Sequence, residues 1–107
     1  MIGSGERRRI TFLCDDATER ANVGCVNGTD HRIQVSIGIY DAEGAELEVR
    51  TMRLGPYGMD QINRVLQPWQ PTRGYVDVWS DTDGALFTCY GSVVDNLTND
   101  PMTVLPQ

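Results

Sequence analysis

The sequence predicts a single all-β domain in which about seven or eight short antiparallel strands form a β-sandwich. Three observations predict this class. Apolar residues recur at every second position, turn sequences separate these stretches, and no stretch keeps helical periodicity for more than about two turns. A small closed β-barrel is the alternative, because strand number and alternation do not distinguish two packed sheets from one curled sheet.

The clearest strand covers residues 32–40, where every second residue is β-branched and apolar: Ile33, Val35, Ile37 and Ile39. The turn sequence at residues 41–44 leads into a second strand that ends at Leu54, so the two strands form a hairpin. Between Arg50 and Leu54 the apolar residues move from odd to even positions. We expect a β-bulge at that point, or a strand that changes its facing.

The remaining strands are expected at residues 10–14, 22–27, 75–80 and 85–94, with a short final strand after Pro101. In the first of these, Ile10, Phe12 and Cys14 are predicted to share one face. Residues 59–66 form either a short strand that ends in a helical turn or a plain strand. Residues 1–8 are expected to be a flexible tail, and residues 9–107 have the length of one ordinary domain.

The charge balance excludes several classes of partner. The chain has 15 acidic residues against nine arginines and no lysine, and its net charge is −6. Three of the arginines, Arg7, Arg8 and Arg9, lie in the expected tail, so the folded body is acidic and repels phosphate backbones. No apolar run approaches the roughly 18 residues of a membrane helix. We therefore expect neither nucleic-acid binding nor membrane insertion.

The sequence offers no arrangement typical of catalysis or of a metal site. His31 is the only histidine, and the three cysteines lack the close spacing of a zinc knuckle. Turn carboxylates are numerous, but the acid that completes a calcium loop is missing after Gly44 and Gly84. We predict no catalytic residue, no metal and no cofactor. The alternative is a small hydrolase that uses turn carboxylates: Asp41, Glu43, Asp81 and Asp83.

Aromatic side chains are the candidates for ligand binding. Tyr75 and Trp79 alternate with Val76 and Val78, so valines that face the core place both rings on the outside of the sheet. Trp69 and Tyr57 are expected in loops. We predict that these four aromatic residues contact a protein or glycan partner. In the alternative, Tyr75 and Trp79 belong to the core face.

The cysteine pairing stays open between two alternatives. The odd number of cysteines, and a length that supports a core without crosslinks, favour buried reduced thiols. The second alternative is a disulfide between Cys25 and Cys89.

Four segments carry a resemblance to a known group of proteins: residues 22–27 (NVGCVN), 39–44 (IYDAEG), 61–65 (QINRV) and 90–101 (YGSVVDNLTNDP). Together they resemble the bacterial immunoglobulin-like β-sandwich modules that are appended to secreted or cell-surface proteins, including peptidases. The resemblance implies an immunoglobulin-like fold and a secreted or cell-surface location, and it implies no catalytic residues. Cys25 and Cys89 stand where those modules have aliphatic or small residues, which fits buried thiols.

These observations favour a non-catalytic binding or spacer module. Besides the hydrolase, self-association through an edge strand or an apolar face is an alternative, which makes a homo-oligomer the third hypothesis. A free-standing protein of this type could equally be cytoplasmic.

Overall fold

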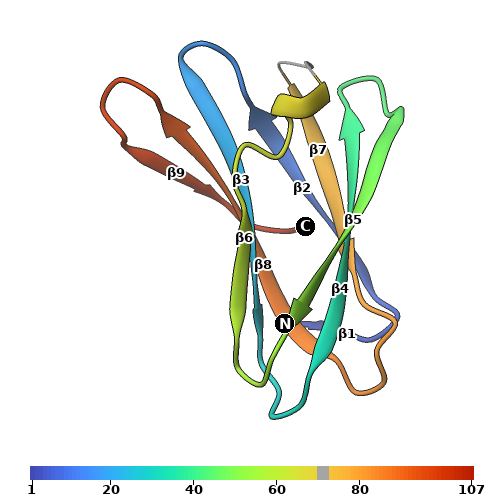
Figure 1. The fold of residues 1–107 in the computed structure, drawn as a ribbon. Helices are drawn as coiled ribbons and strands as arrows, with labels where there is room; N and C mark the ends of the chain where they lie inside the picture. Colours follow the sequence, from blue (N-terminus) through green and yellow to red (C-terminus); the bar gives the residue numbers. More distant parts are fainter. Residues whose placement is uncertain (70–72) are drawn as a thin grey trace.

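The computed structural model describes residues 1–69 and 73–107, and these residues form strands and a single 3-10 turn. The elements in chain order are β1 (Ile2–Gly3), β2 (Arg7–Cys14), β3 (Glu19–Asn27), β4 (Ile33–Asp41), β5 (Glu46–Leu54), β6 (Met59–Ile62), η1 (Gln67–Trp69), β7 (Arg73–Trp79), β8 (Leu86–Asp95) and β9 (Pro101–Val104). Residues 59–66 follow the first of the two expected patterns, since a short strand is succeeded by turns (Figure 1).

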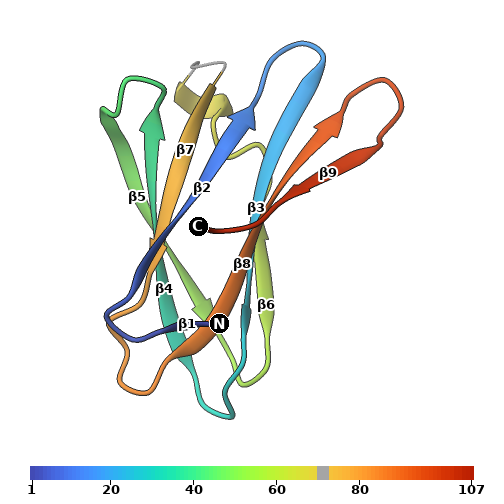
Figure 2. The same ribbon diagram turned by 180° about the vertical axis from the view of Figure 1, so that it is seen from behind.

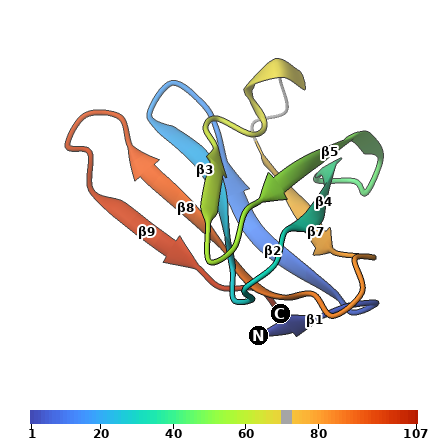
Figure 3. The same cartoon turned by 60° about the horizontal axis from the view of Figure 1, so that its bottom comes forward.

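The strands form two antiparallel sheets. Sheet A has the order β1-β8-β3-β6, and β9 also pairs with β8; sheet B has the order β2-β7-β4-β5. Strands β1 and β9 lie along the same edge of β8, because β1 pairs with Leu86 and Phe87 whereas β9 pairs with residues 91–94. The sheets keep separate edges and do not close on each other, so the fold is a β-sandwich and the barrel alternative is wrong (Figures 1 and 3).

The core lies between the inner faces of the two sheets. The alternation predicted for β4 is confirmed, because Ile33, Val35, Ile37 and Ile39 are all buried. The predicted inner residues of β3 (Val23 and Cys25), β7 (Val76 and Val78) and β8 (Phe87, Cys89 and Val93) are buried as well. Each fully buried aliphatic or aromatic side chain contributes about 1.5–3 kcal/mol to the free energy of unfolding, so this layer is the main stabilising term.

Two strands depart from simple alternation. In β2 the register shifts between Ile10 and Leu13, so these two residues face the core while Phe12, with a φ of 60°, is exposed. The expectation that Phe12 shares a face with Ile10 is wrong. In β5 the irregularity lies at Leu47, between the pairs Ile39–Glu48 and Tyr40–Glu46, which is earlier than the expected position. A bulge shifts the alternation by one residue, and local composition does not locate it sharply.

The N-terminal segment belongs to the sandwich. Instead of a tail over residues 1–8, Ile2 and Gly3 form β1 on sheet A and Arg7 begins β2 on sheet B. The opposite end of the chain returns to the same region, where the backbone N–H of Gln107 donates to Arg9 O at 2.8 Å and its C=O accepts from Arg9 N at 2.9 Å. The two termini therefore lie near each other, around the middle of the sandwich in Figure 2.

Candidate functional site

The outer face of β7 carries Tyr75, Asp77 and Trp79, opposite the buried Val76 and Val78. The register places Arg7 and Arg9 of β2 beside Trp79 and Asp77 on one side of β7. On the other side, Tyr40 of β4 lies beside Tyr75. The six outward side chains gather on three adjacent strands of sheet B and are called the arginine–aromatic cluster: Arg7, Arg9, Tyr40, Tyr75, Asp77 and Trp79.

Asp77 is the anchor of the arginine–aromatic cluster. Its side chain is only 7% exposed, and both of its oxygens accept hydrogen bonds from arginines. Arg9 donates from Nε at 2.8 Å and from Nη2 at 3.2 Å, and Arg7 donates from Nε at 3.1 Å. Burial by itself raises the pKa of Asp77, but the hydrogen bonds from Arg9 and Arg7 outweigh it and hold the pKa below its ordinary value. Asp77 is therefore a carboxylate at neutral pH.

The same arginines cover the aromatic rings. The guanidinium of Arg7 lies 4.0 Å from the ring centroid of Trp79, and that of Arg9 lies 4.3 Å from the ring centroid of Tyr75. Tyr75 stacks on Tyr40 with 5.0 Å between ring centroids, and Arg7 Nη2 donates to the Tyr40 hydroxyl at 2.8 Å. Each arginine is thus fixed by a carboxylate and by a ring face at once.

A glycine makes room for this arrangement. A Cβ atom at Gly38 would lie 3.1 Å from the Tyr40 ring and 3.2 Å from the Trp79 ring. Both rings therefore come close to the β4 backbone at Gly38, where a larger residue would push them away. Sheet A has the same device, since the ring of Tyr90 covers Gly24 and its hydroxyl donates to Gln61 Oε1 at 2.6 Å.

The exposed surface of the arginine–aromatic cluster is cationic. The side chains of Arg7 and Arg9 are 49% and 51% exposed, and their Nη1 groups have no hydrogen-bond partner among the described residues. Two arginines and one aspartate leave a local charge of +1 on a chain whose net charge is −6. Preorganised guanidinium groups of this kind bind carboxylates, because little side-chain entropy remains to be lost.

The four aromatic residues predicted to bind a ligand do not lie together in the structure. Tyr75 and Trp79 lie on the outer face as expected, and Tyr40, Arg7 and Arg9 join them. Tyr57 is exposed in the turn between β5 and β6, where its N–H donates to Thr29 O at 2.9 Å, outside the arginine–aromatic cluster. Trp69 ends η1, and its side chain lies outside the described part of the chain. A run of three arginines is typical of a solvated tail, so the sequence does not mark Arg7 and Arg9 as site residues; their alternation along β2 is the signal that could have found them.

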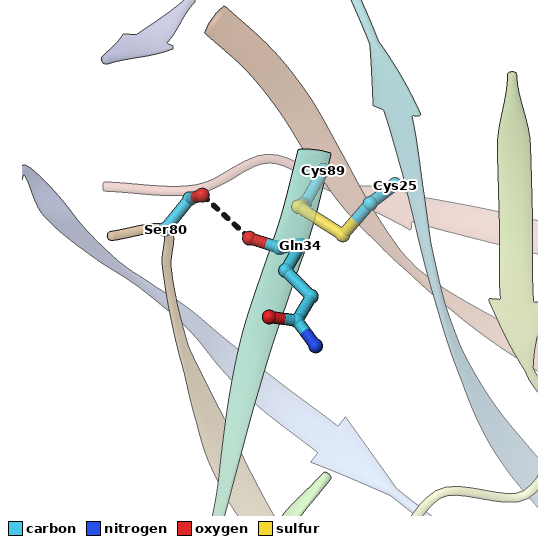
Figure 4. Close-up of a disulfide and its surroundings, with 4 residues drawn as sticks. All are labelled: Cys25, Gln34, Ser80 and Cys89. Atoms are coloured by element: carbon cyan, nitrogen blue, oxygen red, sulfur yellow. Dashed lines mark hydrogen bonds between the residues drawn. A yellow bond between two sulfur atoms is a disulfide. The ribbon is translucent and has the colours of Figure 1, made fainter. Parts of the chain in front are cut away.

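Cys25 and Cys89 form a disulfide (Figure 4). They face each other directly in the β3–β8 register, with Cα atoms 4.0 Å apart, and both are buried. The alternative of two buried reduced thiols is thereby replaced, and Cys14 is the free cysteine. The bond crosslinks neighbouring strands of one sheet, whereas the disulfide of antibody domains joins the two sheets.

The turn carboxylates of the hydrolase hypothesis lie in two separate turns. Asp41 pairs with Gly74 at the start of β7, whereas Asp81 and Asp83 follow the end of β7, so the full length of that strand separates them. Asp41 Oδ1 also accepts the backbone N–H groups of Glu43 and Ala45, which gives it a turn-forming role. Within residues 1–69 and 73–107, no group of three or more His, Cys, Asp or Glu residues could hold a metal ion.

Comparison with known proteins supports the fold alone. No family model matches the chain, and no curated protein sequence matches it. The crystal structure of Thermotoga maritima 1070 is similar, with a TM-score of 0.70 over 100% of this chain and 96% of that chain, at 10% sequence identity. This likeness extends over the whole sandwich. In the part of the chain that the structure describes, none of the helices has the length and apolarity required to span a membrane.

Proposed function

We propose that this chain is a non-catalytic, immunoglobulin-like binding module that contacts its partner through the arginine–aromatic cluster. The observation that carries the proposal is the pair of half-exposed guanidinium groups, each stacked on an aromatic ring and held by Asp77. Arginine, tyrosine and tryptophan are the residues that dominate the energetics of protein interfaces. A spacer role is the simpler form of the same proposal, in which this face has only a structural task.

The partner class follows from what covers the rings. Sugars stack on free aromatic faces, but Arg7 covers one face of Trp79, while Arg9 and Tyr40 lie against Tyr75. The groups left for a ligand are guanidinium N–H donors, which suit carboxylates. A protein surface or peptide rich in Asp and Glu therefore fits this face better than a glycan does.

The disulfide supports a location outside the reducing cytosol. Disulfides form and persist in secreted and cell-surface proteins and are rare where glutathione keeps thiols reduced. The buried Cys25–Cys89 bond thus agrees with the resemblance to modules of exported bacterial proteins. We place this chain in the same kind of environment.

A peptide-display selection on the folded protein tests the proposed function. We expect the selected peptides to be rich in Asp and Glu, to bind more weakly as salt concentration rises, and to lose affinity about tenfold with Arg9→Gln. Arg50→Gln is the matched control, because Arg50 is exposed on β5 on the side of sheet B opposite the arginine–aromatic cluster. A parallel glycan array in which binding depends on Trp79 and not on Arg9 would contradict the choice of a protein partner.

A further inference from the structure

The edge of the sandwich next to β2 carries a second surface, which adjoins the arginine–aromatic cluster at Tyr75 but includes neither Asp77 nor its arginines. Here the β8–β9 hairpin diverges from β2 (Figures 1 and 2). Between them lies a mostly apolar groove of about 560 Å³, whose walls include Phe12 and Leu13 of β2, Val93 of β8 and Met102 of β9. This volume is in the range of cavities that take a ligand or several side chains of a partner.

Phe12 forms one wall of the groove and projects from it. Its side chain is 79% exposed, and its φ of 60° is unusual for a bulky residue. The β2 bulge that turns Ile10 and Leu13 inward holds Phe12 outward. Strain of this kind, in combination with a large exposed aromatic ring, is typical of positions that are used for contacts.

The rim of the groove carries both signs of charge. Glu19 and Arg73 line it, and both lie near enough to Cys14 to influence the pKa of its thiol in opposite directions. A strongly acidic or basic partner would gain little from such a rim. A second copy of this chain has the same rim. A two-fold axis can bring Glu19 of one copy toward Arg73 of the other, and this pairing favours association.

We propose that a second copy of this chain occupies the groove, so that the protein forms a two-fold dimer in which each copy inserts Phe12 into the groove of the other. The projecting ring and the apolar groove belong to one patch, which is the requirement for an isologous contact. The dimer covers exposed apolar surface of Phe12 and Met102 on both copies. This inference does not rest on the proposed function, since it uses neither Arg7 nor Arg9.

Sedimentation velocity of the intact protein at rising concentration, up to about 1 mM, tests the dimer. We expect the wild type to dimerise and Phe12→Gly to raise the dissociation constant at least about 30-fold, because both copies lose the inserted ring. Glycine tolerates the positive φ at position 12, so the variant should fold with an unchanged Tm. Leu97→Ser is the control, because Leu97 is 90% exposed in the β8–β9 turn and does not line the groove.

Cys14 supplies an independent readout because it lies in the groove and is the free thiol. We expect alkylation of Cys14 by a bulky maleimide to slow as wild-type concentration rises, and to stay constant in Phe12→Gly. Should Phe12→Gly fold poorly, Met102→Glu on the opposite wall tests the same contact. A wild type that remains monomeric at about 1 mM overturns the proposal, even if the groove then binds a small apolar ligand. A dimer that Leu97→Ser weakens as much as Phe12→Gly overturns it as well.

Discussion

Sheet A and sheet B each join two neighbouring strands by side chains, but with different chemistry on opposite faces. In sheet A, the Cys25–Cys89 disulfide links β3 to β8 on the inner face and is buried. In sheet B, Asp77 links β7 to β2 on the outer face through two half-exposed arginines. The first link responds to reductant alone, whereas the second responds to pH and salt and remains accessible to a partner. The binding surface proposed above uses the exposed link, on sheet B.

The largest effect is expected from removal of the disulfide. The two cysteines are 64 residues apart, and in the chain-entropy model the loss of that crosslink costs about 4 kcal/mol of the free energy of unfolding. We expect this loss for the double variant Cys25→Ala/Cys89→Ala in urea unfolding at pH 7. Cys14→Ala is the control and should change little. A thiol count of one per unfolded, unreduced chain checks the premise, and a count of three would contradict it.

Asp77→Asn should produce the next largest effect. The substitution keeps the shape of the side chain but removes the charge that fixes both arginines, and hydrogen bonds to charged groups contribute about 1.5–3 kcal/mol each in favourable cases. Because the arginines are half exposed and screened, we expect a loss of about 2 kcal/mol in urea unfolding. Asp83→Asn in an exposed turn is the matched control. Equal stabilities of the two variants would show that the outer link is not structural.

Acid should weaken the Asp77 link in sheet B and the Asp16 turn between β2 and β3, and it should leave the disulfide untouched. The pKa of Asp77 is below its ordinary value, and backbone hydrogen bonds from Thr18 and Glu19 together with the Thr18 hydroxyl lower the pKa of Asp16 to about 2. As the pH falls, these carboxyl groups take up protons at a higher pH in the unfolded chain than in the folded chain. The stabilisation is therefore complete above about pH 4 and is lost as the pH falls from about 4 toward 2. Unfolding free energies measured across this range should fall more steeply in wild type than in Asp77→Asn. Parallel slopes would contradict the assignment.

The smallest expected effect compares the two glycines that lie beneath aromatic rings. A Cβ at Gly24 would overlap the ring of Tyr90, whereas a Cβ at Gly38 would lie at 3.1–3.2 Å from Tyr40 and Trp79. We expect Gly24→Ala to lower the free energy of unfolding by about 1 kcal/mol more than Gly38→Ala, because Tyr90 must leave the sheet and lose its bond to Gln61. Near-ultraviolet circular dichroism and urea unfolding measure the difference. The reverse order would show that the outer rings of sheet B are the more tightly packed.

Much of the sandwich was predictable because alternation is a local property. The residues at alternate positions of β4 could be assigned to the core from their spacing, and the same holds for Val76 and Val78 of β7. The position of Phe12 was not predictable, because a bulge of one residue reverses every facing beyond it and leaves no local mark in composition. For the same reason, the position of the bulge at Leu47 could not be predicted from the sequence.

The candidate site was predictable only in its aromatic half. Tyr75 and Trp79 follow from strand alternation, but Arg9 and Asp77 are 68 residues apart and meet only because β2 pairs with β7. The disulfide is a similar case, since the sequence contained both cysteines and two pairing alternatives. The register of β3 against β8 places the two side chains directly opposite each other.

The sequence by itself determined the all-β class, the faces of the regular strands and the acidic charge, since these depend on neighbours along the chain. The tertiary structure alone decided which strands are adjacent, and therefore which charges and thiols meet. Strand pairing joins residues far apart in sequence, and its register is set by the packing of whole sheets and by bulges. The cationic face of an acidic protein, with Asp77 beneath Arg7 and Arg9, is a consequence of that pairing.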